Sequence, residues 1–188
     1  MASLLALYEP RLLRADEFLE IDFGPKLKAE LDNGVIHMMA GASARHDQIQ
    51  INLIAALRDR LRGSGCRPSG SDLRINTHGF SVRYPDVSIY CGRTGPEDDR
   101  RTVRDDPKVV IEILSPSTAQ ADRNVKLDEY KGLASVDAVV LIDPEGERVH
   151  AVHRAPHGWT RFDNAGTADL DLPTLGLTVP HAEIFARD

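Results

Sequence analysis

The chain has 188 residues, of which 41% are hydrophobic and 28% charged, and its formal net charge is −6. This length suits one domain with a sizeable core and is short for two. The composition is that of an average globular protein, which excludes disordered and fibrous classes. No segment approaches the ~20 apolar residues that span a bilayer. We therefore expect a single domain over residues 1–188, with no membrane anchor and a cytoplasmic location.

The cysteines and the charge distribution narrow the class further. Cys66 and Cys91 are far apart and form no CxxC pair, which argues against a disulfide or a thiolate metal site. The negative net charge argues against a general nucleic-acid coat protein, because phosphate binding needs clustered Lys and Arg. The segment from Ala42 to Arg93 differs, since it holds eight arginines and four acidic residues. This middle part of the chain can therefore face phosphate.

The first third of the chain predicts a short helix, a hairpin and a longer helix. The short helix is expected over Arg14–Ile21. Strands over Leu27–Leu31 and Val35–Met39 flank Asp32-Asn33-Gly34, and Asn-Gly is a strong hairpin signal because it tolerates positive φ. Ser43 can cap a helix that runs to about Arg62. Apolar residues recur at every fourth position of that helix and predict a buried stripe, namely Ile49, Leu53, Leu57 and Leu61.

The rest of the chain predicts antiparallel strands followed by a strand, helix and strand. The expected elements are strands at 66–76 and 82–90, a charged loop at 95–106, a buried strand at 108–114, a helix at 119–133, a buried strand at 138–142, a hairpin of 148–154 with 158–162, and a last helical turn from 182. Two apolar strands joined by a helix are typical of a parallel crossover. This order predicts an α+β fold around a mixed sheet.

Two acidic residues lie within apolar strands. Asp86 stands in Tyr84-Pro85-Asp86-Val87-Ser88, and Glu112 stands in Val109-Val110-Ile111-Glu112-Ile113-Leu114. A carboxylate among Val and Ile is costly unless it is paired, hydrogen-bonded or bound to a cation. Two of them on neighbouring strands indicate a metal, and oxygen ligands favour Mg²⁺ or Mn²⁺. Alternatively, Asp86 lies at the solvent end of its strand and Glu112 pairs with a structural Arg or Lys.

Six short motifs follow one another over nearly the whole chain. They are Glu30-Leu31-Asp32-Asn33-Gly34-Val35-Ile36, Arg45-His46, Ser71-Asp72-Leu73-Arg74, Tyr84-Pro85-Asp86-Val87, Glu112-Ile113-Leu114-Ser115-Pro116-Ser117-Thr118, and Asp122-Arg123 with Lys126-Leu127 and Tyr130. In these motifs the sequence resembles the Uma-type restriction endonucleases of the PD-(D/E)XK nuclease superfamily. The resemblance implies a restriction-endonuclease-like mixed sheet flanked by helices, with additional antiparallel hairpins. It also implies a Mg²⁺- or Mn²⁺-dependent endonuclease that hydrolyses phosphodiester bonds in DNA, and cutting two strands would need a homodimer.

The resemblance also implies the catalytic residues. Asp86, Glu112 and the carbonyl of Ile113 would bind the metal, and Glu30 would be an additional acid. The superfamily pattern expects a lysine two residues after Glu112, where this chain has Leu114.

Lys126 is the position that matches the missing lysine. An amine beside a metal-bound water can orient the water and stabilise the charge that grows in the transition state. Tyr130 lies one helical turn away on the same face. The alternative is that Lys126 belongs to a charged helix face exposed to solvent.

Three residues are candidates for substrate binding: His46, Tyr130 and Arg74. His46 would be a poor cation at a helix N-terminus, so we expect it to hydrogen-bond a phosphate, to position a water, or to serve as a cap or core residue. His150 and His153 are discounted as a metal pair, because their odd spacing on a strand directs them to opposite faces.

Two other functions stay open at this point. The chain could be a binding or accessory protein that keeps a nuclease fold without turnover, since fold alone does not carry function. Leu114 and the acidic net charge favour that interpretation. The chain could also be a hydrolase that acts on another phosphate ester.

Overall fold

The computed structural model describes residues 11–24, 27–39, 41–92, 95–115, 122–163 and 167–187. Its centre is a six-stranded sheet with the strand order β10-β9-β8-β7-β6-β3. The strands are β3 (Cys66–Gly70), β6 (Val87–Cys91), β7 (Val109–Ile113), β8 (Ala138–Asp143), β9 (Arg148–Ala155) and β10 (Gly158–Asp163). β7 and β8 run parallel, and the other neighbours in this sheet are antiparallel. The expected α+β fold around a mixed sheet is confirmed.

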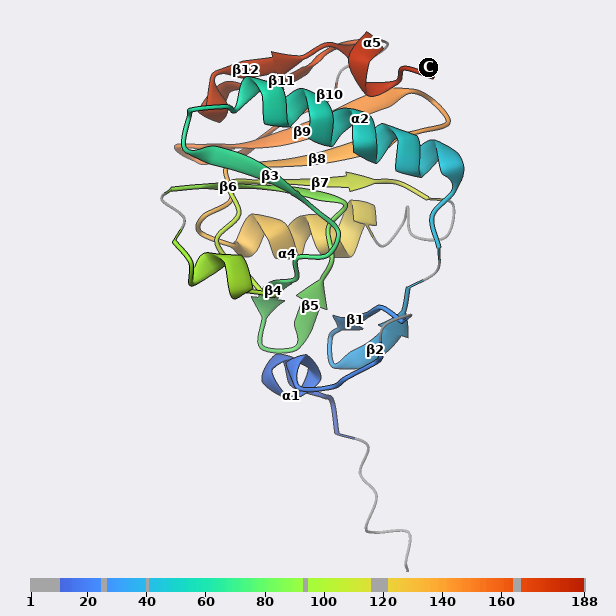
Figure 1. The fold of residues 1–188 in the computed structure, drawn as a ribbon, viewed down its shortest axis with the longest axis vertical. Helices are drawn as coiled ribbons and strands as arrows, with labels where there is room; N and C mark the ends of the chain where they lie inside the picture. Colours follow the sequence, from blue (N-terminus) through green and yellow to red (C-terminus); the bar gives the residue numbers. More distant parts are fainter. Residues whose placement is uncertain are drawn as a thin grey trace, which may run out of the picture.

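One face of the main sheet is covered by α2 (Ala44–Arg60) (Figure 1). The predicted stripe of this helix is confirmed, because Ile49, Leu53 and Leu57 are fully buried against apolar residues of β6, β7 and β8. Ser43 caps the helix as expected by accepting a hydrogen bond from the backbone N–H of His46. The small sheet of β11 (Leu170–Leu172) and β12 (Leu177–Val179) and the helix α5 (His181–Ile184) complete this apolar layer.

The opposite face of the main sheet is covered by α4 (Leu127–Gly132), which follows a π-helical turn, η3 (Asp122–Lys126) (Figure 1). This segment connects the parallel strands β7 and β8, as the sequence predicts. Positions 119–121 of the expected helix lie outside the described residues. Tyr130 packs here with Val110, Val136 and Val139 in a second, smaller core cluster.

A second sheet of order β2-β1-β5-β4 lies beyond α4, next to α1 (Ala15–Leu19) (Figure 1). Its strands are β1 (Ala29–Asp32), β2 (Val35–Met38), β4 (Ile75–His78) and β5 (Ser81–Arg83). The hairpin predicted at Asn33-Gly34 is confirmed, and both residues have positive φ, 47° and 84°.

The two long strands expected at 66–76 and 82–90 are each divided between the two sheets. Residues 71–74 separate β3 from β4, and Tyr84-Pro85-Asp86 separates β5 from β6. Proline lacks the N–H that a ladder needs, which explains why a strand stops at Pro85. The chain therefore passes from the small sheet to the main sheet immediately before Asp86.

Several shorter elements complete the fold. The late hairpin is confirmed as β9 and β10, and the last helical turn begins at His181. The 3₁₀ turns η2 (Asp98–Arg100) and η4 (Pro173–Leu175), together with β11 and β12, were not expected from the sequence. No helix among the described residues is long and apolar enough to cross a membrane.

The expectation that the cysteines stay unpaired is wrong. Cys66 and Cys91 lie directly opposite each other in the β3–β6 ladder and form a disulfide. Antiparallel pairing joins residues that are far apart in sequence, so spacing along the chain could not exclude this bond. These two cysteines therefore give no support to a reducing location, where thiols stay unpaired.

Candidate active site

Asp86 lies where the β6–β7 pair begins. The register pairs Val87 with Ile111, so one further step places Asp86 opposite Glu112. The Oδ2 atom of Asp86 accepts a hydrogen bond from the N–H of Ile113 at 2.7 Å and lies 3.2 Å from Nε2 of His46. Gln50 donates to the backbone carbonyl of Asp86 at 2.7 Å. Contacts from both α2 and β7 therefore hold this carboxylate.

Glu112 is in the middle of β7 and only 3% exposed. Its Oε1 atom accepts a hydrogen bond from the hydroxyl of Tyr130 at 2.7 Å and lies 3.6 Å from Nζ of Lys126. Burial and the negative charge of Glu112 raise the pKa of Tyr130 well above its ordinary value. Tyr130 therefore stays protonated and remains a hydrogen-bond donor to the carboxylate.

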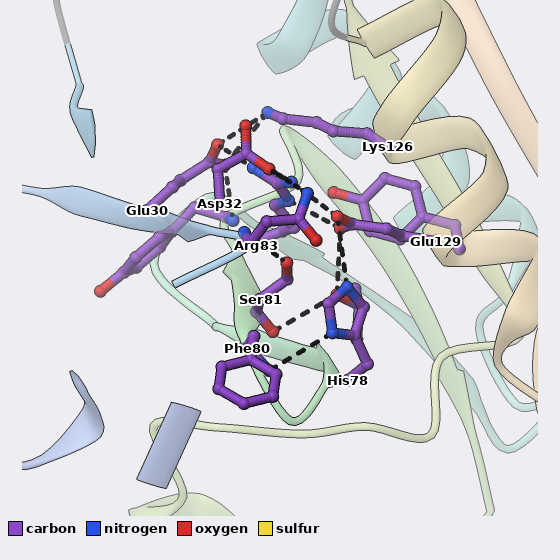
Figure 2. A network of polar contacts seen from close by, with 12 residues as sticks. Glu30, Asp32, His78, Phe80, Ser81, Arg83, Lys126 and Glu129 are labelled. Atoms are coloured by element: carbon purple, nitrogen blue, oxygen red, sulfur yellow. Dashed lines mark hydrogen bonds and ion pairs between the residues drawn. The ribbon is translucent and has the colours of Figure 1, made fainter. Parts of the chain in front are cut away.

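Lys126 is buried, with 7% of the residue exposed. Its Nζ atom lies 3.1 Å and 3.0 Å from the two carboxylate oxygens of Glu30 (Figure 2). The same amine also contacts Glu112. The alternative that placed Lys126 on a solvent-exposed helix face is therefore wrong. Lys126 is the last residue of η3, and π-helical turns are frequent at functional sites.

Glu30 is held by the small sheet. The backbone N–H of Tyr84 donates to its Oε1 atom at 3.0 Å, and Nη1 of Arg83 lies 3.6 Å from its Oε2 atom. Both Tyr84 and Arg83 come from the segment that leads to Asp86. The segment that carries the candidate ligand Asp86 therefore also fixes the carboxylate of Glu30, which pairs with Lys126.

Arg83 is the centre of a buried network that the sequence did not predict (Figure 2). Its guanidinium donates to both oxygens of Glu129 at 2.7 Å and to Asp32 at 2.7 Å, and only 3% of the residue is exposed. Burial opposes the charge of Arg83, but the hydrogen bond and the charge of Glu129 raise its pKa. One signal was available, because an arginine within a buried strand needs a partner.

Among the residues that the structure describes, carboxylates outnumber permanent cations in this region. The described acidic residues are Glu30, Asp32, Asp86, Glu112 and Glu129, and the described permanent cations that contact them include Arg83 and Lys126. Excess negative charge out of water is unfavourable unless a cation balances it.

The contact with Asp86 changes the pKa of His46. Burial lowers the pKa of its imidazole, but the hydrogen bond and charge of Asp86, together with the backbone of Ile113, raise it above its ordinary value overall.

The donors near Asp86 and Glu112 fit a hard divalent cation. Two carboxylates and the Ile113 carbonyl are oxygen ligands, and Mg²⁺ is usually held by one or two carboxylates with water and substrate phosphate. Among the described residues, no group of three His, Cys, Asp or Glu side chains converges on one point. A metal held by two carboxylates would take its other ligands from solvent and substrate.

The remaining candidates differ in their relation to this cluster. His46 contacts Asp86 directly. Tyr130 is fully buried, and its hydroxyl donates to the carboxylate of Glu112. The hydroxyl is therefore not at the surface that a substrate would contact. The guanidinium of Arg74 donates to Oγ1 of Thr102 at 2.9 Å and to the Thr102 carbonyl. Arg74 therefore holds the charged loop and is not joined to the carboxylates by these bonds.

Known proteins resemble this chain over most of its length. The uncharacterized proteins slr1290 and sll1609 of Synechocystis sp. are each 29% identical to it. The matches cover 88% of this chain and 87% of slr1290, and 71% of this chain and 76% of sll1609.

The fold is shared with a solved structure, a putative nuclease belonging to DUF820 from Anabaena variabilis. The TM-score is 0.75 at 21% sequence identity, and the match covers 93% of this chain and 98% of that one. Residues 15–182, which include every residue of the cluster described above, match the Uma2 family model, described as putative restriction endonuclease. The chain therefore belongs to the Uma2 family of putative restriction endonucleases.

Proposed function

We propose that this protein is an endonuclease that hydrolyses phosphodiester bonds of DNA with Mg²⁺ or Mn²⁺. The observation that carries the proposal is the buried ammonium group of Lys126, which lies 3.6 Å from Glu112 and is paired with Glu30. Lys126 supplies the amine that is missing at Leu114, and it reaches the carboxylate from a different element. Membership of the Uma2 family supports the same reaction class.

Asp86, Glu112 and the carbonyl of Ile113 would hold the metal. When bound, the metal would polarise the phosphoryl group and lower the pKa of a water molecule. The ammonium of Lys126 would orient the attacking water and stabilise the negative charge that grows on the phosphate oxygens. Glu30 keeps the ammonium at this position through contacts to both of its carboxylate oxygens.

Several residues act by positioning these groups. Tyr130 orients Glu112, while His46 and Gln50 orient Asp86. Arg83 holds the acidic residues of β1 and α4 in one network and so fixes Glu30 relative to Lys126. A hydrogen-bonded shell of this kind limits the movement of the reacting groups.

A protein that cuts both strands of DNA needs two such sites, so we propose a homodimer as the active form. The competing function is an accessory protein that binds DNA or metal without turnover. Leu114 favours this second function, because it is buried and apolar where the superfamily pattern expects lysine.

Plasmid DNA separates the two functions. We expect purified protein with Mn²⁺ to relax or linearise supercoiled plasmid, and Asp86→Ala to abolish cleavage and weaken Mn²⁺ binding in calorimetry. Asp128→Ala is the matched control, because Asp128 is an exposed carboxylate on α4 that pairs with Lys131. Cleavage by Asp86→Ala at the wild-type rate would refute the site. Absence of both cleavage and Mn²⁺ binding in the wild type would favour the accessory protein.

A further inference from the structure

A pocket opens on the α4 side of the main sheet, next to the carboxylate cluster. Its apolar walls are Leu127, Val139, Leu141 and Val152, and its polar lining is Asn124, His150 and Arg161. The pocket encloses a volume of about 210 Å³.

The strand register relates the pocket to the candidate active site. Glu112 pairs with Leu141 across β7 and β8, and Leu141 pairs with His150 across β8 and β9. Paired residues point to the same face, and neighbouring strands are about 4.8 Å apart. The backbone of His150 is therefore roughly 10 Å from that of Glu112, in one row across the sheet.

The connecting helix approaches the pocket from the same side. Asn124 and Leu127 line the pocket, and they lie on either side of Lys126 in the sequence. The amine of Lys126 contacts Glu112. A DNA strand with its scissile phosphate at Glu112 and Lys126 would thus place a neighbouring nucleotide at the pocket.

The chemistry of the lining fits a nucleobase. An imidazole, a guanidinium and a carboxamide are planar groups that stack on bases or hydrogen-bond their edges. The aliphatic walls suit the flat, weakly polar surface of a base. An inorganic phosphate would leave these walls unused, and a purely apolar ligand would leave the planar polar groups unused.

We propose that this pocket receives an unpaired nucleobase of the DNA strand, adjacent to the phosphate that is cut. This inference rests on the proposed nuclease function and specifies its substrate. Because a base inside a duplex is stacked and paired, it has to leave the helix before it can enter a pocket. The protein therefore prefers single-stranded DNA, or DNA with a locally opened base pair, over intact duplex.

The test measures binding without cleavage. A fluorescein-labelled single-stranded oligodeoxynucleotide and the matching duplex are titrated in EDTA and followed by anisotropy. Arg161→Ala removes the exposed guanidinium of the pocket, and Val152→Trp fills the pocket. The controls are Arg62→Ala and Ile51→Trp on the α2 side, where the native side chains are exposed.

We expect tighter binding of the single strand than of the duplex by the wild type. Both pocket variants should weaken single-strand binding by about tenfold, the order of one lost base-stacking contact, and leave duplex binding nearly unchanged. The controls should match the wild type. A second probe is a single strand with an abasic nucleotide at the position that occupies the pocket. The wild type should bind this probe as weakly as the pocket variants bind the intact strand.

Three results would overturn the proposal. Single-strand binding could be unaffected by both variants. Both DNA forms could lose affinity equally, which would show attraction to the backbone alone. Free dAMP could displace the oligonucleotide completely at equal concentration, which would identify a mononucleotide site. Because binding is measured in EDTA, the result is separate from plasmid cleavage, whose failure would refute the nuclease and leave the base-binding pocket standing.

Discussion

The two faces of β7 show two ways of burying a strand. Ile111 and Ile113 face α2 and lie in a large cluster made only of apolar side chains. Glu112 faces α4 and is as well buried as its neighbours, but its partners are a tyrosine hydroxyl and a lysine amine. The α2 face is stabilised by removal of apolar area from water. The α4 face depends on charges that have to balance one another, which is the arrangement a reactive site needs.

This difference predicts that the faces respond differently to substitution. On the α2 face a smaller side chain leaves a cavity, which lowers stability but not activity. On the α4 face the loss of one charged group leaves its partners buried and unpaired. Substitutions around Arg83 should therefore lower both stability and activity. Substitutions elsewhere should affect mainly one of the two.

The largest effect on stability is expected for Arg83→Met. It leaves the carboxylates of Glu129 and Glu30 without the guanidinium, and breaking a buried ion pair costs about 3–5 kcal/mol of unfolding free energy. Urea unfolding measures this loss. Arg62→Met is the control, because the Arg62 side chain is 80% exposed.

The double variant Arg83→Met/Glu129→Leu sharpens this test. Replacing both partners by apolar groups should recover part of the lost stability, because a buried pair is often matched by apolar packing. If Arg83→Met alone unfolds like the wild type, the network has no structural role.

Lys126→Ala should lower activity strongly and lower stability less than Arg83→Met does. Loss of one transition-state donor typically lowers the rate about 10²–10³-fold, while Glu30 keeps its hydrogen bond from Tyr84. Plasmid cleavage under single-turnover conditions measures the rate. Lys131→Ala removes a lysine of α4 that pairs with Asp128 and should cleave normally. Equal rates for both variants would exclude Lys126 from catalysis.

Leu53→Ala tests the apolar face. Leu53 is fully buried in the α2 layer, so its truncation should cost about 2–5 kcal/mol of unfolding free energy. The rate per folded molecule should stay that of the wild type. Ile51→Ala, on the exposed side of the same helix, should change neither quantity. A rate loss in Leu53→Ala at a temperature where the variant is fully folded would show that the two faces are coupled.

The smallest effect is expected from pH. Burial raises the pKa of Glu129, but its hydrogen bond and ion pair with Arg83 lower it overall below the ordinary 4.5. A lowered folded-state pKa stabilises the protein above the unfolded-state value, and this contribution is lost as the pH falls through the folded-state value. Stability should therefore decrease with acidification below about pH 5, less steeply in Glu129→Gln. Urea unfolding across this range measures the slopes, and identical slopes would contradict the role of Glu129.

Much of the fold could be predicted from local patterns. The stripe from Ile49 to Leu57, the Asn33-Gly34 hairpin and the crossover between β7 and β8 each depend on residues close together in sequence. Two strand predictions extended too far, because residues 71–74 and 84–86, where the chain changes sheets, were taken as parts of continuous strands. Pro85 was the available sign of that change.

The candidate site was predicted in part. Asp86 and Glu112 were identified because a carboxylate in an apolar strand needs a partner. The side chains of His46, Tyr130 and Lys126, which contact these acids, were all candidate residues, but the network of Arg83 and Glu129 was not identified. Arg83 and Glu129 are 46 positions apart, and no local pattern relates an arginine on one strand to a glutamate on a distant helix.

The sequence by itself determined where acids interrupt apolar strands, which helix faces are buried and where the chain turns, since these depend on propensities and periodicities of near neighbours. Only the tertiary structure decided that Lys126 points inward to Glu112 and Glu30, that Arg83 joins β1 to α4, and that Cys66 meets Cys91. Contacts between distant segments depend on how strands pair and sheets pack, and many pairings satisfy the same local pattern. The acids that we propose as metal ligands could therefore be predicted first, and the charges around them only after the sheets were placed.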